Sequence, residues 1–211
     1  MKYSKVIIYG AGGLGREILQ MVRVTLGKEA DILGYADDGV EPGTVRSGGI
    51  VLGGREFLDS MNEPFALVFG VSDPSAKRRL YAGLKANPLI SFPNVIHPKA
   101  SVSEYASLGE GVVMAENSLA SVDSVIGNCV FVNYGSMIGH DTVIGDWTSI
   151  MPMAAVSGSV RIGEASLIGA GSAVIQGVTV GNGSTVGIGS VVIKDVPDGA
   201  TVFGSPAVRV S

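Results

Sequence analysis

The chain has 211 residues, 46% of them hydrophobic and 16% charged, so it can bury a sizeable core and is not predicted to be disordered. A net charge of -4 argues against a general nucleic-acid surface, because phosphate binding needs clustered Lys and Arg. The one cysteine, Cys129, excludes an internal disulfide framework and fits a reducing compartment. No apolar run reaches the roughly 18 residues of a membrane span. We therefore expect a cytoplasmic protein that neither inserts into membranes nor binds nucleic acid.

The N-terminal part of the chain alternates strand and helix signals. Lys5–Tyr9 is a short apolar run typical of a buried strand, and it enters a glycine turn with no signal-peptide cleavage site. A helix is expected after this turn. Further strands are predicted at Ile32–Ala36 and Phe65–Phe69, followed by a helix with Asp73 as N-cap and Pro74 at its first position. This alternation indicates a small parallel α/β sheet.

In the C-terminal part, an aliphatic or small apolar residue recurs every six positions. The register runs without interruption from Ile96 through Ile138 to Val192, with a small or β-branched residue four positions after each. Such a period predicts a parallel β-helix of short strands, with three strands in each coil of about 18 residues. An ordinary β-sandwich does not hold this period. We therefore predict two domains, a Rossmann-like α/β domain at residues 1–92 and a β-helix at 93–211.

Two histidines are the candidate catalytic bases. His97 lies in the opening repeat before Pro98 and is interpreted as structural. His140 occupies the third position of its repeat and is expected to point outward, either as a solvated surface residue or as a base. Acyl transfer from a thioester needs such a base near neutral pH. Cys129 and Trp147 are also expected to face outward, Cys129 without a catalytic role and Trp147 at a subunit interface.

Residues 18 apart stack in a column in such a coil, and the column of His140 contains Gly158, Gln176 and Lys194. Gly158 is expected one coil above His140, where its N–H can face a thioester carbonyl. Lys194 is three coils above, about 14 Å away by the strand spacing. An extended pantetheine can follow this column and bring its phosphates to Lys194, which is equally well interpreted as a solvated lysine.

The turn at residues 10–15, with the sequence GAGGLG, is a candidate phosphate site. It fits G-x-G-x-x-G, whose free N–H groups at a helix N-terminus suit any phosphate. Asp37 and Asp38 end the second strand, where an acid can bind a ribose hydroxyl. Gly70–Val71 would line the same crevice, and Arg78 is either a phosphate ligand or solvated. An NAD site is an alternative, although the domain is small for both halves of a dinucleotide fold.

Motifs along nearly the full length of the chain match one family. They are GAGGLG at 10–15, Asp37-Asp38, Ile96-His97-Pro98, Asn133, IGHDTVIGD at 138–146, SGSVRIG at 157–163 and VPDGATVFGSPA at 196–207. With these motifs the chain resembles the left-handed β-helix acyltransferases, and in particular the sugar-nucleotide acetyltransferases of the PglD and NeuD type from bacterial glycan biosynthesis. The resemblance implies homotrimers associating through the β-helix, acetyl-CoA in the cleft between neighbouring β-helices, and direct transfer to an amino or hydroxyl group.

The same resemblance implies residue roles. It makes His140 the general base, Asp141 its acidic partner, Asn133 a positioning residue and Gly158 a backbone donor near the thioester. Together with the column, Gly158, Gln176 and Lys194 form the expected CoA site, and no metal is expected. The nucleotide sugar is expected at Gly10, Gly12, Gly13, Leu14, Gly15, Asp37, Asp38, Gly70, Val71 and Arg78. In one departure, Leu14 stands where some members carry a histidine, and Leu14 cannot hydrogen-bond a substrate.

Three other functions could be carried by this scaffold. A zinc enzyme of the γ-type carbonic anhydrase kind needs three histidines around the metal, and the chain has two. A non-catalytic sugar-nucleotide-binding protein stays open as an alternative. So does an acyltransferase with a different acceptor, such as sialic acid or a serine-like amine, or with a longer acyl donor.

Overall fold

The computed structural model describes residues 5–27 and 30–211, and the chain divides into two compact units. The first unit takes in residues up to Ser72 together with Arg79–Val95, and the second takes in Asp73–Arg78 and Ile96–Ser211. The main change of unit falls between Val95 and Ile96, and the short segment Asp73–Arg78 at the start of one helix is counted with the second unit. No helix in the described ranges is long and apolar enough to cross a bilayer.

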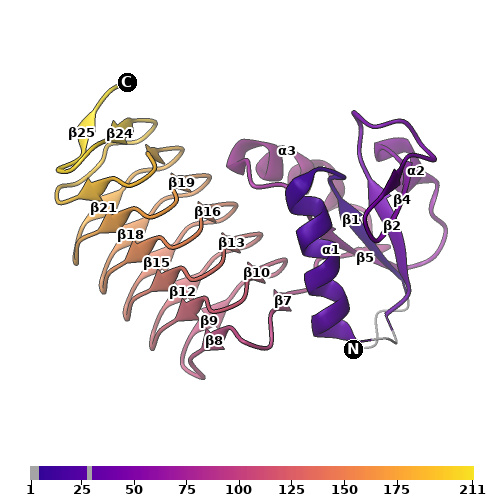
Figure 1. The fold of residues 1–211 in the computed structure, drawn as a ribbon, viewed down its shortest axis with the longest axis horizontal. Coiled ribbons are helices and arrows are strands. Elements are labelled where there is room, and N and C mark those ends of the chain that lie inside the picture. Colours follow the sequence, from indigo (N-terminus) through magenta and orange to yellow (C-terminus); the bar gives the residue numbers. More distant parts are fainter. Residues whose placement is uncertain (1–4, 28–29) are drawn as a thin grey trace. The chain divides into compact units, whose positions relative to one another are not determined.

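The N-terminal unit is a mostly parallel sheet with helices in the connections (Figure 1). Its strand order is β3 (Val45–Arg46), β4 (Gly49–Gly53), β2 (Ile32–Ala36), β1 (Val6–Tyr9), β5 (Phe65–Phe69) and β6 (Ile90–Ser91). The predicted strands β1, β2 and β5 are confirmed, and β1 pairs in parallel with β2 on one side and β5 on the other. Since the strand order reverses at β1, a crevice is expected at the carboxyl ends of β1 and β5.

The helices of this part follow the strands along the chain. They are α1 (Gly13–Leu26) after β1, α2 (Arg55–Ser60) after β4 and α3 (Pro74–Leu84) after β5. α1 buries Ile18 and Val22, which lie one turn apart on its inner face. α3 begins where the sequence predicts, because the Asp73 carboxylate accepts a hydrogen bond of 2.6 Å from the N–H of Ala76.

The second unit is a parallel β-helix of short strands, and its stacked coils are visible in Figure 1. The β7 sheet contains β7 (Val95–Ile96), β10 (Val113–Met114), β13 (Phe131–Val132), β16 (Ser149–Ile150), β19 (Leu167–Ile168), β22 (Thr185–Val186), β24 (Thr201–Phe203) and β25 (Val208–Arg209). The β8 sheet contains β8 (Ser101–Val102), β11 (Leu119–Ala120), β14 (Met137–Ile138), β17 (Ala155–Val156), β20 (Ala173–Val174) and β23 (Val191–Val192). The β9 sheet contains β9 (Ser107–Leu108), β12 (Val125–Ile126), β15 (Val143–Ile144), β18 (Arg161–Ile162) and β21 (Thr179–Val180).

The coil length agrees with the six-residue period. Ile138 lies opposite Val156, and Val156 lies opposite Val174, so each coil takes 18 residues. From Met114 onward the recurring apolar side chains are buried, and with the partly buried Ile96, Val102 and Leu108 they form one continuous core along the β-helix. After β22 the register shortens, because Val186 pairs with Val202, only 16 residues further on. The unbroken period thus ends near Val192, where the sequence pattern ends.

The corners of the β-helix are closed by small hydroxyl side chains. Thr142 donates to the carbonyl of Ser157 at 2.9 Å, and Ser136 donates to the carbonyl of Met151 at 2.7 Å. Each bond joins one coil to the next and satisfies a polar group at the corner. Corner residues with left-handed φ values, Asp141 among them at 56°, recur at many of these corners. This backbone conformation therefore belongs to the fold and does not by itself mark a site.

Candidate active site

The side chains of His140 and Asp141 form a hydrogen-bonded pair on the outer surface of the β-helix. They follow β14 at a corner, and the imidazole Nδ1 lies 2.7 Å from Asp141 Oδ2. The two side chains are 51% and 58% exposed, so His140 points outward as its register predicts. Because Nδ1 faces the carboxylate, it carries the proton in the neutral ring and leaves the Nε2 lone pair for a substrate.

Gly158 lies directly against the imidazole ring. A Cβ atom added at Gly158 would come within 2.5 Å of His140 Nε2 and 2.6 Å of Cε1, so any side chain here would displace the ring. The neighbouring N–H of Ser159 donates to the carbonyl of His140 at 2.7 Å and holds the two corners together. No acceptor among the described residues takes a hydrogen bond from the N–H of Gly158. A backbone donor is thus available next to the candidate base.

A hollow of about 230 Å³ lies beside His140 on the outer face of the β8 sheet. It spans three coils and is lined by Leu119, Ser121, Met137, Ile138, Gly139, His140, Ala155, Val156 and Ser157. Leu119, Met137 and Ala155 occupy the same outward position on paired strands. Most of its lining is therefore apolar, with the imidazole at its edge.

Gln176 and Lys194 continue the column above Gly158. The strand pairs that place them run from Ile138 to Val156, then to Val174 and Val192. Both side chains are exposed. The structure therefore brings the predicted CoA residues into one accessible line with His140.

Asn133 is not brought together with His140 within one chain. It follows β13, whereas His140 follows β14, so the two lie at opposite ends of β14. The Asn133 side chain is 6% exposed, and its Oδ1 accepts a hydrogen bond of 2.7 Å from the N–H of Tyr134.

In the N-terminal unit, the glycines of the turn after β1 serve two purposes. Gly10 has a φ of +110°, and a Cβ on it would come within 2.8 Å of the Gly70 carbonyl oxygen. A Cβ on Gly15 would overlap the carbonyl oxygen of Gly10. Nothing lies within 4 Å of a Cβ placed on Gly12, and the space around Gly13 is nearly as open. Gly10, Gly15 and Gly70 thus pack the turn against the end of β5, while Gly12 and Gly13 leave backbone accessible to a ligand.

Asp37 braces this turn from the end of β2. Its Oδ2 accepts a hydrogen bond of 2.8 Å from the N–H of Ala11, and its Oδ1 accepts one of 2.9 Å from Gly39. Asp38 beside it accepts a hydrogen bond of 2.6 Å from the hydroxyl of Tyr9. Burial, together with this bond to the carboxylate, raises the pKa of Tyr9, so its hydroxyl stays protonated and donating. Each carboxylate oxygen keeps a second lone pair for a ligand.

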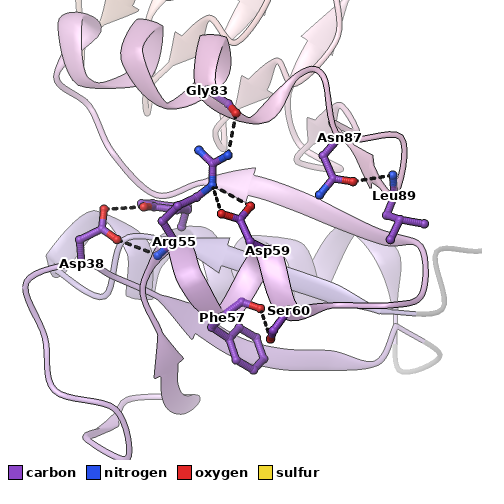
Figure 2. Close-up of polar contacts among 9 residues, drawn as sticks. Asp38, Arg55, Phe57, Asp59, Ser60, Gly83, Asn87 and Leu89 are labelled. Atoms are coloured by element: carbon purple, nitrogen blue, oxygen red, sulfur yellow. Dashed lines mark hydrogen bonds and ion pairs between the residues drawn. The ribbon is translucent and has the colours of Figure 1, made fainter.

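Arg55 is a residue of this region that the sequence analysis missed. Its backbone N–H donates to Asp38 Oδ1 at 2.8 Å, and its guanidinium joins the Asp59 carboxylate at 2.9 Å and the Gly83 carbonyl at 2.8 Å (Figure 2). The side chain thereby ties α2 to the C-terminal part of α3, where a positive charge is favourable. Asp38 is consequently held by both Tyr9 and Arg55.

Two further predicted nucleotide residues lie beside the glycine turn, and one is engaged elsewhere. Leu14 is in the first turn of α1, and Val71 Cγ2 would lie 3.1 Å from a Cβ on Gly10. Arg78 is counted with the β-helix unit, where its guanidinium carbon lies 5.5 Å from the centre of the Trp147 ring. This cation–π contact already occupies the Arg78 side chain.

Lys77, in the first turns of α3, is buried within the β-helix unit at 1% exposure. Its Nζ donates to the carbonyl oxygens of Cys129 and Thr148, both at 3.0 Å. Burial lowers the pKa of Lys77 to about 7, although Cys129 and Asp73 partly oppose the shift. Cys129 was expected to face outward, and its side chain is buried beside Lys77, at 2% exposure. No sequence pattern signals this burial.

A parallel β-helix with an outward His–Asp pair beside an open backbone donor is the architecture of a hexapeptide-repeat acyltransferase. Residues 5–84 match the model of the PglD N-terminal domain family. No match was found among curated protein sequences. Solved structures, in contrast, match nearly the whole chain, and several of them are named as acetyltransferases.

One similar structure is the acetyltransferase domain of PglB from Neisseria gonorrhoeae, which is 33% identical with a TM-score of 0.91 over 98% of this chain and 100% of that one. A second is a His-to-Asn variant of perosamine N-acetyltransferase from Caulobacter crescentus, in complex with CoA and GDP-perosamine. It is 30% identical, with a TM-score of 0.89 over 98% of this chain and 97% of that one. WeeI from Acinetobacter baumannii is 29% identical, with a TM-score of 0.88 over 97% of this chain and 99% of that one.

The chain therefore belongs to the PglD-type family of left-handed β-helix sugar acetyltransferases. The predicted fold, an α/β domain followed by a left-handed β-helix, is confirmed, and so is the predicted enzyme class. The roles of individual residues in this chain are a separate question, which the geometry of the site addresses.

Proposed function

We propose that the protein transfers the acetyl group of acetyl-CoA to the amino group of a nucleotide-linked sugar, with His140 as the general base. The observation that carries this proposal is the His140–Asp141 pair, with the open N–H of Gly158 beside its ring. Related structures hold acetyl-CoA in one case and CoA with GDP-perosamine in another, which supports both substrate classes.

In the proposed reaction, the amine nitrogen attacks the thioester carbonyl while Nε2 of His140 takes its proton. Negative charge then develops on the carbonyl oxygen, where the N–H of Gly158 donates a hydrogen bond. As the carbon–sulfur bond breaks, the proton on Nε2 can pass to the leaving CoA sulfur. Asp141 stabilises the imidazolium formed between these steps and orients the ring through Nδ1.

CoA is proposed to follow the column that rises from Gly158. Gln176 and Lys194 are exposed along this line, so an extended pantetheine arm can run past them. The ammonium group of Lys194 then provides a positive charge for the phosphates at the far end.

The nucleotide sugar is proposed to bind at the carboxyl ends of β1, β2 and β5. The accessible N–H groups of Gly12 and Gly13 at the start of α1 suit the diphosphate, because no side chain caps this helix. Asp37 and Asp38 keep acceptor capacity for the nucleoside. Leu14, Gly70 and Val71 complete the proposed lining. Gly10, Gly15 and Gly70 hold the turn in place by close packing. Arg78 is not part of this proposed site, because its guanidinium lies over Trp147.

The proposed assembly is a homotrimer with its active sites between neighbouring β-helices. Asn133 and His140 lie at opposite ends of β14, so both can serve one site only if two copies contribute. Exposed apolar side chains such as Met153, at 68%, favour association of the β-helices. Light scattering should therefore give three times the chain mass of 21.6 kDa. A fully active monomer would contradict the assembly.

An acceptor screen tests the proposed function. Release of free thiol from acetyl-CoA is measured with GDP-, UDP-, dTDP- and CMP-linked amino sugars, and thermal shifts record binding of the same compounds. We expect thiol release with an amino sugar and none with its hydroxyl analogue. Binding of sugar nucleotides without thiol release from any of them would instead identify a non-catalytic binding protein. Tight NAD binding that no sugar nucleotide displaces would contradict the proposed acceptor site.

A further inference from the structure

The outward residues of the β8 sheet change size abruptly at the hollow beside His140. Leu119 and Met137 are large, whereas Ala155 and Ala173, at the same position on the next paired strands, are small. Met137 is 50% exposed and lines the hollow, so its side chain borders the space beside the imidazole. A hollow thus opens next to the candidate base with a thioether along one side.

The direction of CoA decides which part of the substrate meets Met137. The proposed pantetheine arm rises from Gly158 toward Lys194, so the thioester sulfur lies on the Gln176 side of the carbonyl. The acyl carbon chain leaves the carbonyl in the opposite direction, toward the strands that carry Met137 and Leu119. The apolar lining of the hollow suits a hydrocarbon group at this end.

We propose that Met137 is a specificity-determining residue that closes the acyl end of the site and limits the donor to short acyl groups. This inference rests on the proposed function, because it takes the hollow as the place of the acyl group. In this arrangement an acetyl methyl group would lie beside the Met137 side chain, and a longer acyl chain would have to extend against Met137 and Leu119. Apolar pockets discriminate by roughly tenfold or more per methylene when they cannot yield.

Binding of acyl-CoA to the full-length protein tests the inference without any acceptor. Isothermal titration measures Kd for acetyl-, propionyl- and butyryl-CoA with the wild type and with Met137→Ala. We expect the wild type to bind butyryl-CoA about tenfold or more weakly than acetyl-CoA, and the variant to reduce this ratio to roughly twofold or less. Val125→Ala is the matched control, because Val125 is a 46% exposed outward residue on the β9 sheet, away from the hollow. The ratio of the butyryl-CoA Kd to the acetyl-CoA Kd in Val125→Ala should equal that of the wild type.

A second substitution approaches the same hollow from the other side. Ala155→Leu fills the hollow, so it should weaken binding of acetyl-CoA. Binding of free CoA, which lacks the acyl group, should stay nearly unchanged. Two results would overturn the inference and leave the proposed function standing. One is normal binding of acetyl-CoA with a Kd ratio that Met137→Ala does not change. The other is equal weakening of CoA and acetyl-CoA binding by Ala155→Leu. Failure of the wild type to bind any acyl-CoA would overturn both.

Discussion

The imidazole ring of His140 lies against Gly158, one coil further along the β-helix, with no room for a Cβ between them. Gly158→Ala should therefore displace the ring from its position beside Asp141 without unfolding the coil. We expect kcat to fall by roughly 10²-fold, the lower part of the range for a positioned general base. Steady-state kinetics with a melting temperature measured on the same sample would check this prediction.

A double-mutant cycle tests whether Gly158→Ala acts through the imidazole ring. If Gly158→Ala acts by moving the imidazole, it should have little further effect in a protein that already carries His140→Ala. Fully additive losses would show that the two positions act independently and would contradict the account of their contact.

Mixed assemblies test whether Asn133 and His140 come from different copies. Asn133→Ala and His140→Ala should each be nearly inactive alone, because each removes one side of every site. Co-expressed and purified together, they should recover about a quarter of the wild-type sites, since random pairing joins two intact sides that often. Activity of the mixture equal to the mean of the two single variants would contradict a shared site.

Asp37 should influence acceptor binding through the glycine turn. Asp37→Ala removes the acceptor for the Ala11 N–H, and we expect the KM for the sugar nucleotide to rise about tenfold, the worth of a charged hydrogen bond. The KM for acetyl-CoA should stay within about twofold of the wild-type value. Glu17→Ala, which removes an exposed acid of α1, is the control and should leave both constants unchanged.

Lys77 should make stability depend on pH in the alkaline range. Its pKa is lowered to about 7 in the folded protein from the ordinary lysine value of 10.5, so the unfolded chain holds more protons between these values. The free energy of unfolding should therefore rise with pH from about 7, by at most about 1.4 kcal/mol per unit for one proton. Measurements should stop near pH 9.5, because Tyr9 and Tyr35, with raised pKa values, act in the opposite direction when tyrosine ionises.

Lys77→Met removes the titrating group and keeps an unbranched side chain of similar length. Urea unfolding of this variant should lose most of the pH slope between pH 7 and 9.5. Lys194→Met, at an exposed position, should keep the wild-type slope. Equal slopes in the wild type and Lys77→Met would show that the buried ammonium is not responsible.

The β-helix could be predicted almost completely because its pattern is local and repeated. The six-residue period placed the inward residues from Ile96 to Val192, and the coil length then placed Gly158 next to His140. The outward direction of His140 followed from the same count. In the N-terminal unit, the apolar runs that became β1, β2 and β5 were equally clear.

The rest depended on contacts between distant parts of the sequence. The β3–β4 hairpin lies in a glycine-rich stretch without a regular period, and α2 is only one and a half turns long. Burial of Lys77 and Cys129 has no local signal, because a lysine early in a helix is normally solvated. The hydrogen bonds of Asp37 and Arg55 likewise appear only once the strands and helices are assembled.

Single-turnover kinetics of His140→Ala test the central claim most directly. With acetyl-CoA and the amino-sugar nucleotide that the wild type accepts, the variant should transfer acetyl roughly 10²- to 10⁴-fold more slowly. Its Kd for acetyl-CoA should stay close to the wild-type value, because the imidazole serves the acceptor. Asp141→Asn should show a smaller loss in the same direction, and Cys129→Ala should be nearly silent. A His140→Ala protein that keeps full activity, or a wild type that forms a competent acetyl-enzyme with acetyl-CoA alone, would contradict the account.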